Sequence, residues 1–176
     1  MTARAVFLDR DGVLNEAVVR DGRPYPPPDA ESMKIFPDAA PALAGLKAAG
    51  FLLIVVTNQP DVARGAQSRA AVEAMNAVLA ARLPLDDFFI CWHEDRDQCG
   101  CRKPKPGLLR EAADRYGIDL QASFLIGDRW RDIDAGAAGG CRTIWIDRQY
   151  QERKPTAEPD FRAVSLQQAA EWILKS

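Results

Sequence analysis

Two carboxylates follow a short apolar run near the start of the chain, in the segment FLDRDGV at residues 7–13. Neither aspartate can enter an apolar core without a severe desolvation cost, so we expect both at the exposed end of a buried strand. Their separation suits one divalent cation bound by Asp9 and nearby oxygens, which leaves Asp11 free for proton transfer. The alternative is a solvated turn, because Asp and Gly are ordinary loop residues.

A second group of reactive side chains lies between residues 91 and 101, in the pattern Cys91-x-His93 followed by Cys99-x-Cys101. Three thiolates and one imidazole match a closed tetrahedral Zn²⁺ site with no open position for catalysis. We therefore expect a structural zinc that fixes this loop just ahead of residues 102–103. The alternative is a set of reduced cysteines in a loop.

Apolar runs alternate with segments of helical periodicity along the chain. We expect strands over residues 5–8, 51–56, 88–92, 123–126 and 143–146. We expect helices from residue 37 to a stop at Gly50, over 68–83, 106–116 and 132–138, and from residue 165 onward. The prolines of residues 24–28 suggest an extended polyproline-like loop.

This alternation predicts an α/β fold, a single-domain doubly wound (Rossmann-like) parallel sheet over residues 1–176 with the zinc loop 91–101 inserted. Such sheets bind ligands beyond the carboxyl ends of their strands. Polar side chains of Asp9, Thr57 and Asp128 follow three of the expected strands. The candidate site is therefore expected at that edge of the sheet.

Composition excludes several classes of function. The 23 basic and 25 acidic residues give a net charge of −2, without the basic excess that nucleic-acid binding needs. The longest apolar run, residues 51–56, is far shorter than the roughly 18 residues of a membrane span. The N-terminus lacks the plan of a signal peptide, so we expect a cytoplasmic protein. We also expect a monomer with no nucleic-acid or membrane partner. Of the four cysteines, Cys141 lies outside the cluster and is expected in the core.

Four short motifs occur in order: DRDG at residues 9–12, TNQ at 57–59, KP at 103–104, and GD at 127–128 with Asp132. On these motifs the chain resembles the haloacid dehalogenase superfamily of aspartyl-phosphate hydrolases, over about residues 5–147. Residues 14–36 are too few for the helical cap domain of many superfamily members. The resemblance therefore implies a capless phosphatase with an open site.

The resemblance assigns catalytic roles to five residues. It implies that Asp9 attacks phosphorus and that Asp11 protonates the leaving oxygen and then activates water. Thr57 and the backbone amide of Asn58 would bind the phosphoryl oxygens, and Lys103 would offset their charge. The enzyme would thus be a phosphoric monoester hydrolase that forms an aspartyl-phosphate.

The resemblance also implies a Mg²⁺ held by Asp9, the carbonyl of Asp11 and Asp128, which would offset repulsion between carboxylate and phosphate. Asp132 would orient Lys103 or a metal-bound water. Alternatively, Asp132 only stabilises the N-terminus of a helix, where a carboxylate interacts favourably with the helix dipole.

The zinc loop and the CRKP segment at 101–104 make the chain similar to the superfamily phosphatases that act on heptose bisphosphates. This implies removal of the C7 phosphate of D-glycero-D-manno-heptose 1,7-bisphosphate, with histidinol phosphate or another small phosphomonoester as the alternative. Those enzymes commonly have Ser-Gly where this chain has Pro60-Asp61, and a carboxylate disfavours an anionic substrate unless it faces away. A zinc-stabilised binding domain without turnover would lack a catalytic group, and none is missing.

A bisphosphate needs a second cationic anchor away from the metal, and four arginines are candidates. The resemblance favours Arg102 and Arg129, and Arg20 and Arg64 complete the set. Each could instead be a solvated surface side chain, above all Arg20 and Arg64.

Overall fold

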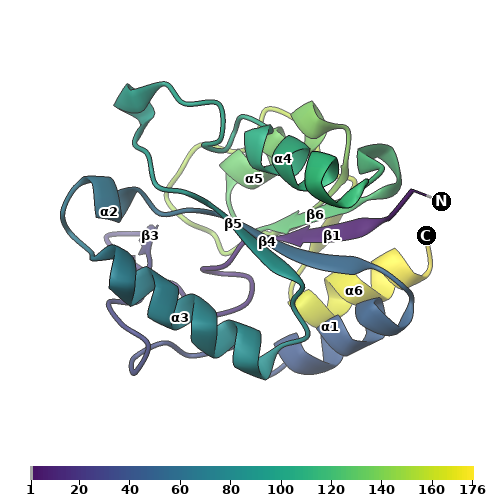
Figure 1. Cartoon of the computed structure of the whole chain (residues 1–176), viewed down its shortest axis with the longest axis horizontal. Coiled ribbons are helices and arrows are strands. Elements are labelled where there is room, and N and C mark those ends of the chain that lie inside the picture. Colours follow the sequence, from purple (N-terminus) through teal and green to yellow (C-terminus); the bar gives the residue numbers. More distant parts are fainter. Residues whose placement is uncertain (1) are drawn as a thin grey trace.

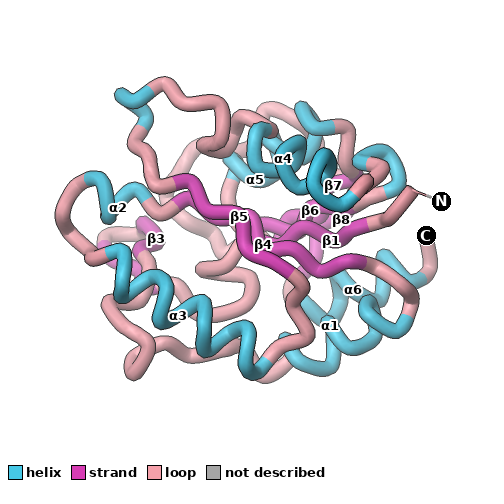
Figure 2. The backbone as a smooth tube through the Cα atoms, in the orientation of Figure 1, coloured by secondary structure: helices cyan, strands magenta, loops and turns pink. Residues whose placement is uncertain are grey.

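A six-stranded sheet runs through the middle of the protein in the computed structural model, which describes residues 2–176 (Figures 1 and 2). The strand order is β5-β4-β1-β6-β7-β8, and every neighbouring pair is parallel. These strands are β1 Ala5–Leu8, β4 Leu52–Asn58, β5 Asp87–Cys91, β6 Phe124–Gly127, β7 Arg142–Ile146 and β8 Phe161–Ala163. The predicted doubly wound parallel sheet is therefore confirmed.

Helices cover both faces of this sheet. Figure 1 shows α4 and α5 on one face and α1, α3 and α6 on the other. The α-helices are α1 Ala39–Ala48, α2 Pro60–Ala63, α3 Arg69–Arg82, α4 Gly107–Tyr116, α5 Trp130–Gly139 and α6 Leu166–Leu174. The 3₁₀ turns are η1 Asp95–Asp97 and η2 Leu120–Ala122. Among residues 2–176, no helix is both long enough and apolar enough to cross a bilayer.

The central strand β1 is apolar throughout because both of its faces are buried. Val6 and Leu8 pack into the core on the side of α1 and α6, whereas Ala5 and Phe7 pack into the core beneath α4. Successive side chains of a strand point to opposite faces, so a strand covered on both faces has no polar position. Burial on both faces holds β1 rigidly, and Asp9 follows its last residue.

Local signals mark the helix ends as expected. The side-chain oxygen of Ser68 accepts from the backbone N–H of Ala71 at the start of α3, and that of Ser165 accepts from Gln168 at the start of α6. Gly117 ends α4 in the left-handed conformation, which costs glycine no steric strain.

Three short strands were not foreseen, nor were α2 and the two 3₁₀ turns. Residues 14–36 contain a two-stranded hairpin, β2 Val18–Arg20 and β3 Arg23–Tyr25, and no helical cap domain. The expected polyproline-like loop was wrong for Pro24, which pairs with Val19 in this hairpin. A two-stranded ribbon has free outer edges, where a residue without an N–H is tolerated. Strand β8 also escaped prediction, because three residues are too few for a periodic signal.

The order of connections decides where the site forms. From β1 the chain passes through α1 to β4 on one side, and it returns through α4 to β6 on the other side of β1. Strand β1 therefore lies at the point where the crossovers diverge to opposite faces, the position at which open α/β sheets bind ligands. The C-terminus lies at the other end of the molecule from α2 (Figure 1).

Candidate active site

Lys103 and Asp9 form a buried ion pair beyond the end of β1. The Nζ atom of Lys103 donates to Asp9 Oδ1 at 2.8 Å, to Asp132 Oδ1 at 2.6 Å and to the carbonyl of Val56 at 2.7 Å. The three acceptors use all three N–H donors of the ammonium group. Burial opposes the charge of Lys103, but the carboxylates of Asp132 and Asp9 outweigh it and raise its pKa. Lys103 is therefore a fixed positive charge beside Asp9.

Asn58 positions the backbone that carries this lysine. Its amide Nδ2 donates to the carbonyl of Lys103 at 3.1 Å, and its Oδ1 accepts from the N–H of Lys103 at 3.1 Å. The two bonds join the end of β4 to a segment that lies 45 residues further along the chain. The side chain of Asn58 thus has a positioning contact that the sequence did not indicate, in addition to the role expected for its backbone amide.

Asp11 lies in a network of donors. Its carboxylate accepts from Arg10 Nε at 3.1 Å, from Asn15 Nδ2 at 3.0 Å and from Gln59 Nε2 at 3.0 Å. Gln59 also donates to the hydroxyl oxygen of Thr57 at 3.0 Å, which leaves the Thr57 hydroxyl hydrogen free to donate elsewhere. Gln59 therefore links Thr57 to Asp11, a function that its place in the TNQ motif alone did not reveal.

Three carboxylates meet beside the ion pair. Oxygens of Asp9, Asp128 and Asp132 all lie within 4.8 Å of one another. Burial and the charge of Asp132 raise the pKa of Asp9 to about 6, and burial and the charge of Asp9 raise the pKa of Asp128 well above its ordinary value. A divalent cation in this cluster would offset the repulsion.

The hydrogen bonds of Asp132 and Asp128 differ and indicate different roles for these two carboxylates. Both oxygens of Asp132 accept from the protein, Oδ1 from Lys103 and Oδ2 from the N–H of Arg129 at 3.0 Å. Asp128 instead accepts from Tyr150 through Oδ2, while its Oδ1 is buried without a partner. A buried carboxylate oxygen without a donor is open to a cation, so Asp128 fits a Mg²⁺ site and Asp132 fits the orientation of Lys103.

We expect Tyr150→Phe to weaken Mg²⁺ binding by about 10- to 100-fold, the usual effect of losing a partner of a metal ligand. The Tyr150 hydroxyl donates to Asp128 Oδ2 at 2.8 Å and so fixes the orientation of this carboxylate in the cluster. The melting temperature is measured as Mg²⁺ is added, and the Mg²⁺ concentration that gives half of the maximal rise is compared between variants. Tyr116→Phe removes an equivalent bond to Asp87 on the surface and serves as the control. Equal Mg²⁺ dependence in both variants would contradict the assignment.

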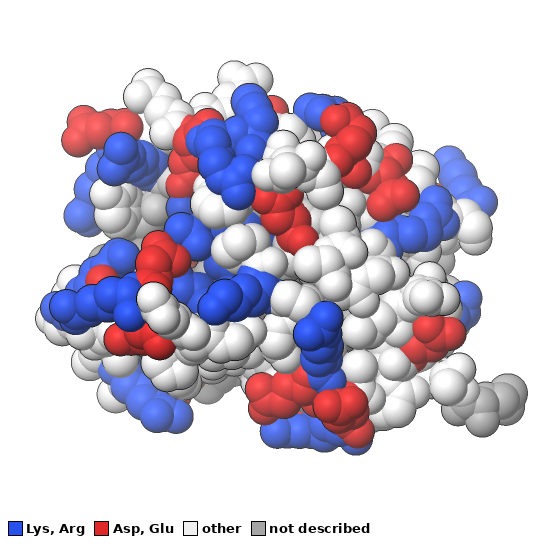
Figure 3. All heavy atoms as spheres, turned by 90° about the horizontal axis from the view of Figure 1, so that it is seen from above, with Lys and Arg blue, Asp and Glu red and all other residues white. Residues whose placement is uncertain are grey.

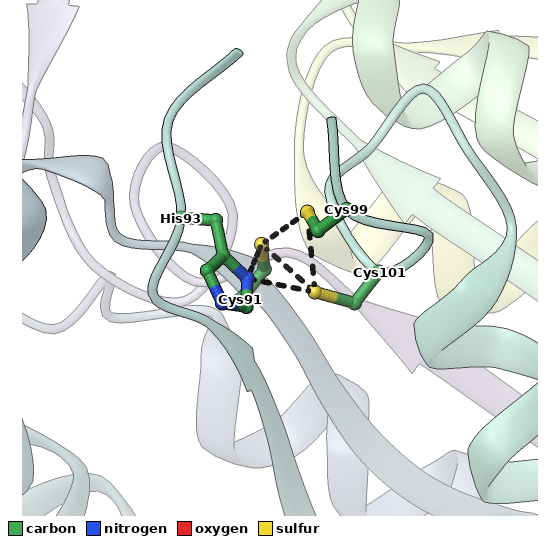
Figure 4. A group of neighbouring side chains, drawn as sticks. All are labelled: Cys91, His93, Cys99 and Cys101. Atoms are coloured by element: carbon green, nitrogen blue, oxygen red, sulfur yellow. Dashed lines mark hydrogen bonds between the residues drawn. The ribbon is translucent and has the colours of Figure 1, made fainter. Parts of the chain in front are cut away.

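The four predicted zinc ligands converge on one point (Figure 4). The Sγ atom of Cys101 lies 3.1 Å from that of Cys91 and 3.5 Å from that of Cys99, and His93 Nδ1 lies 3.3 Å from it. A tetrahedron with Zn–S bonds of about 2.3 Å has edges of about 3.8 Å, close to these separations. Burial opposes ionisation of Cys99, but bonds from the backbone of Arg102 and from the Cys101 thiol lower its pKa to about 7. The cluster could therefore hold a metal ion.

A cavity of about 610 Å³ opens above the ion pair at the carboxyl ends of the strands. Asp9, Asp11, Thr57 and Lys103 all contribute to its lining. Its arginines are Arg23, Arg64, Arg102, Arg129, Arg131 and Arg153. Arg20, expected as an anchor, is not in the lining; it lies in β2 with its guanidinium 5.5 Å from the ring centre of Tyr25.

Carboxylates accompany most of these arginines. Arg129 pairs with Glu152, and Arg64 pairs with Glu94 and with Asp61 at 3.1 Å. Asp61 also lines the cavity, where the neighbouring Arg64 offsets its charge. Positive and negative side chains are likewise interspersed on the face shown in Figure 3. The sequence did not indicate Arg23, Arg131 or Arg153, because a surface arginine carries no local signal of the cavity that it lines.

The comparisons with known proteins agree with this geometry. Residues 27–140 match the family model of haloacid dehalogenase-like hydrolases. The chain is 36% identical to a D-glycero-beta-D-manno-heptose-1,7-bisphosphate 7-phosphatase of Escherichia coli K12, over 98% of this chain and 88% of that protein. A relative of the same name from Pseudomonas aeruginosa is 36% identical over 83% of this chain and 82% of its own.

Among solved structures, a D,D-heptose 1,7-bisphosphate phosphatase from Bordetella bronchiseptica, complexed with magnesium and phosphate, aligns with a TM-score of 0.82. It is 31% identical in sequence, and the alignment covers 98% of each chain. Sequence similarity and fold thus extend across almost the whole chain. The chain belongs to the haloacid dehalogenase-like hydrolases.

Proposed function

We propose that this protein is a Mg²⁺-dependent phosphatase that removes the C7 phosphate of D-glycero-D-manno-heptose 1,7-bisphosphate through an aspartyl-phosphate on Asp9. The observation that carries the proposal is Asp9 itself, paired with Lys103 beneath an arginine-lined cavity. The names of relatives that match nearly the whole chain support the substrate.

In the first step, an Asp9 oxygen forms a bond to phosphorus while the bond from phosphorus to the sugar oxygen breaks. Asp11, in its acid form, gives its proton to that sugar oxygen. Lys103 holds Asp9 at one oxygen and offsets the charge that an incoming phosphate adds. The Thr57 hydroxyl, whose oxygen accepts from Gln59, is free to donate to a phosphoryl oxygen.

In the second step, Asp11 is a carboxylate and takes a proton from water. The water oxygen bonds to phosphorus as the bond to Asp9 breaks, which releases inorganic phosphate and restores both aspartates. The donors from Arg10, Asn15 and Gln59 fix the position of Asp11 through both steps. When bound by Asp9, Asp128 and the carbonyl of Asp11, Mg²⁺ supplies positive charge that draws the phosphate toward Asp9.

We also propose that Cys91, His93, Cys99 and Cys101 bind one structural Zn²⁺. The close approach of the four ligand atoms supports this, and a site with four protein ligands has no position for a substrate. Residues 1–176 would act as one catalytic unit built on the single six-stranded sheet. Monomeric state and cytoplasmic location stay predictions from the sequence.

The substrate assignment predicts a ratio of rates. We expect kcat/KM for the heptose bisphosphate to exceed that for histidinol phosphate by about 100-fold or more, because arginines of the lining can bind a second phosphate and do not bind an ammonium group. Asp61, the carboxylate that could have received an ammonium group, is paired with Arg64. Mg²⁺-dependent phosphate release from both anomers and from histidinol phosphate measures the ratio. Weak, equal rates on all three would keep the phosphatase chemistry and reject the substrate.

A further inference from the structure

Arg102 and Arg131 reach the cavity from different elements and meet at one carboxylate. Arg102 follows the zinc loop and donates through Nε to Asp95 Oδ1 at 2.8 Å. Arg131, in the first turn of α5, donates through Nη1 to Oδ1 and through Nη2 to Oδ2 of the same Asp95, each at 3.0 Å. Three charge-assisted bonds therefore converge on Asp95. This residue lies in η1, between His93 and Cys99 of the zinc loop.

Each guanidinium group also donates to a backbone carbonyl. Arg102 donates to the carbonyl of His93 at 3.3 Å, and Arg131 donates to the carbonyl of Lys103 at 3.3 Å. Arg131 lies 4.5 Å from the ring centre of Trp130. The side chains of Arg102 and Arg131 are only 10% and 20% exposed, so they are ordered parts of the cavity wall and not mobile surface groups.

Two guanidinium groups placed side by side repel each other unless an anion lies between them. Asp95 supplies that anion, and with 61% of its side chain exposed it does so at the rim and not in the protein interior. A phosphate presents several acceptor oxygens and is well matched to paired guanidinium groups, which bind it bidentately. The pair Arg102 and Arg131 thus forms a preorganised anion site in the wall of the cavity that also contains Asp9.

We propose that Asp95 is a positioning residue that holds Arg102 and Arg131 together as the binding site for the second phosphate of a bisphosphate substrate. Through this pair, Asp95 sets the preference of the enzyme for a bisphosphate over a monophosphate. The inference rests on the proposed function and goes beyond it in assigning Arg131 and Asp95, which the sequence did not single out. It also gives the zinc loop a direct side-chain link to substrate binding.

The test compares kcat/KM for D-glycero-D-manno-heptose 1,7-bisphosphate with kcat/KM for the same sugar carrying only the C7 phosphate. We expect Asp95→Asn and Arg131→Gln each to lower this ratio about 10-fold, through a higher KM for the bisphosphate and not through kcat. Loss of orientation weakens ground-state and transition-state binding of the second phosphate equally, which changes KM alone.

Asp97→Asn is the matched control, since Asp97 lies in the same 3₁₀ turn and its carboxylate accepts only from the backbone of Glu94. We expect this variant to keep the wild-type ratio, with metal content and melting temperature measured for all three variants. An unchanged or higher ratio in Asp95→Asn would overturn the inference. So would an equal fall in Asp97→Asn, which would assign the effect to the turn. A wild-type ratio near one would instead reject the bisphosphate substrate, and thus the proposed function.

Discussion

Asp9→Asn is expected to lower turnover by about 10⁴-fold or more, because an amide is a very weak nucleophile and cannot form the aspartyl-phosphate. The amide keeps an oxygen that can accept from Lys103 Nζ, which now lies 2.8 Å from Asp9 Oδ1. Binding and geometry should therefore change little while chemistry stops. Mg²⁺-dependent phosphate release is measured for the wild type and for Asp9→Asn. Mass spectrometry then tests each of these proteins for a covalently bound phosphate.

The fold of Asp9→Asn should survive, because the substitution removes one of three mutually repelling carboxylates and leaves Lys103 paired with Asp132. We expect a melting temperature in the absence of Mg²⁺ no lower than that of the wild type. Asp119→Asn is a suitable control, since Asp119 caps a 3₁₀ turn and asparagine caps equally well. Wild-type turnover by Asp9→Asn would reject the mechanism.

Cys99→Ser is expected to lower zinc content and thermal stability together. Loss of one of four ligands weakens a structural site whose binding free energy contributes to folding. A loss of about 3 kcal/mol would lower the melting temperature of a domain of this size by roughly 10 °C. The measurements are metal content by mass spectrometry and melting temperature with and without a chelator.

Cys141→Ser provides the matched control for that variant. Cys141 is buried in the core beneath α4, outside the cluster, so its replacement removes a thiol without touching a ligand. It should lose some stability from burying a hydroxyl, with no change in zinc content and no change in the effect of chelator. Stoichiometric zinc in Cys99→Ser would contradict the metal site.

Much of the fold follows from local patterns in the sequence. The apolar run of β1 was predicted with the residues that the structure shows, because a strand buried on both faces contains no polar side chain. Ser68 and Gly117 mark helix ends through contacts within a few residues. The predicted ends of other elements differ by one or two residues, and the three-residue strands escaped because they are too short for any periodicity.

The sequence by itself determined the chemical types at the site. Asp9 and the cysteine and histidine cluster stand out because their residue types and spacing are local properties of the chain. The sequence also indicated that such groups follow strand ends, where a parallel sheet gathers them. These inferences need no knowledge of which distant segments touch.

Only the tertiary structure decided which side chains work together. The bond from Lys103 to Asp9 spans 94 residues, and the bonds from Arg131 to Asp95 and from Tyr150 to Asp128 span 36 and 22. No periodicity in the chain encodes such pairs, because they depend on the packing that brings loops from separate strands to one edge of the sheet. The same packing keeps Arg20 out of the cavity lining and brings Arg131 into it. The sequence thus determined the reacting groups, whereas tertiary packing decided their partners and the wall that faces the substrate.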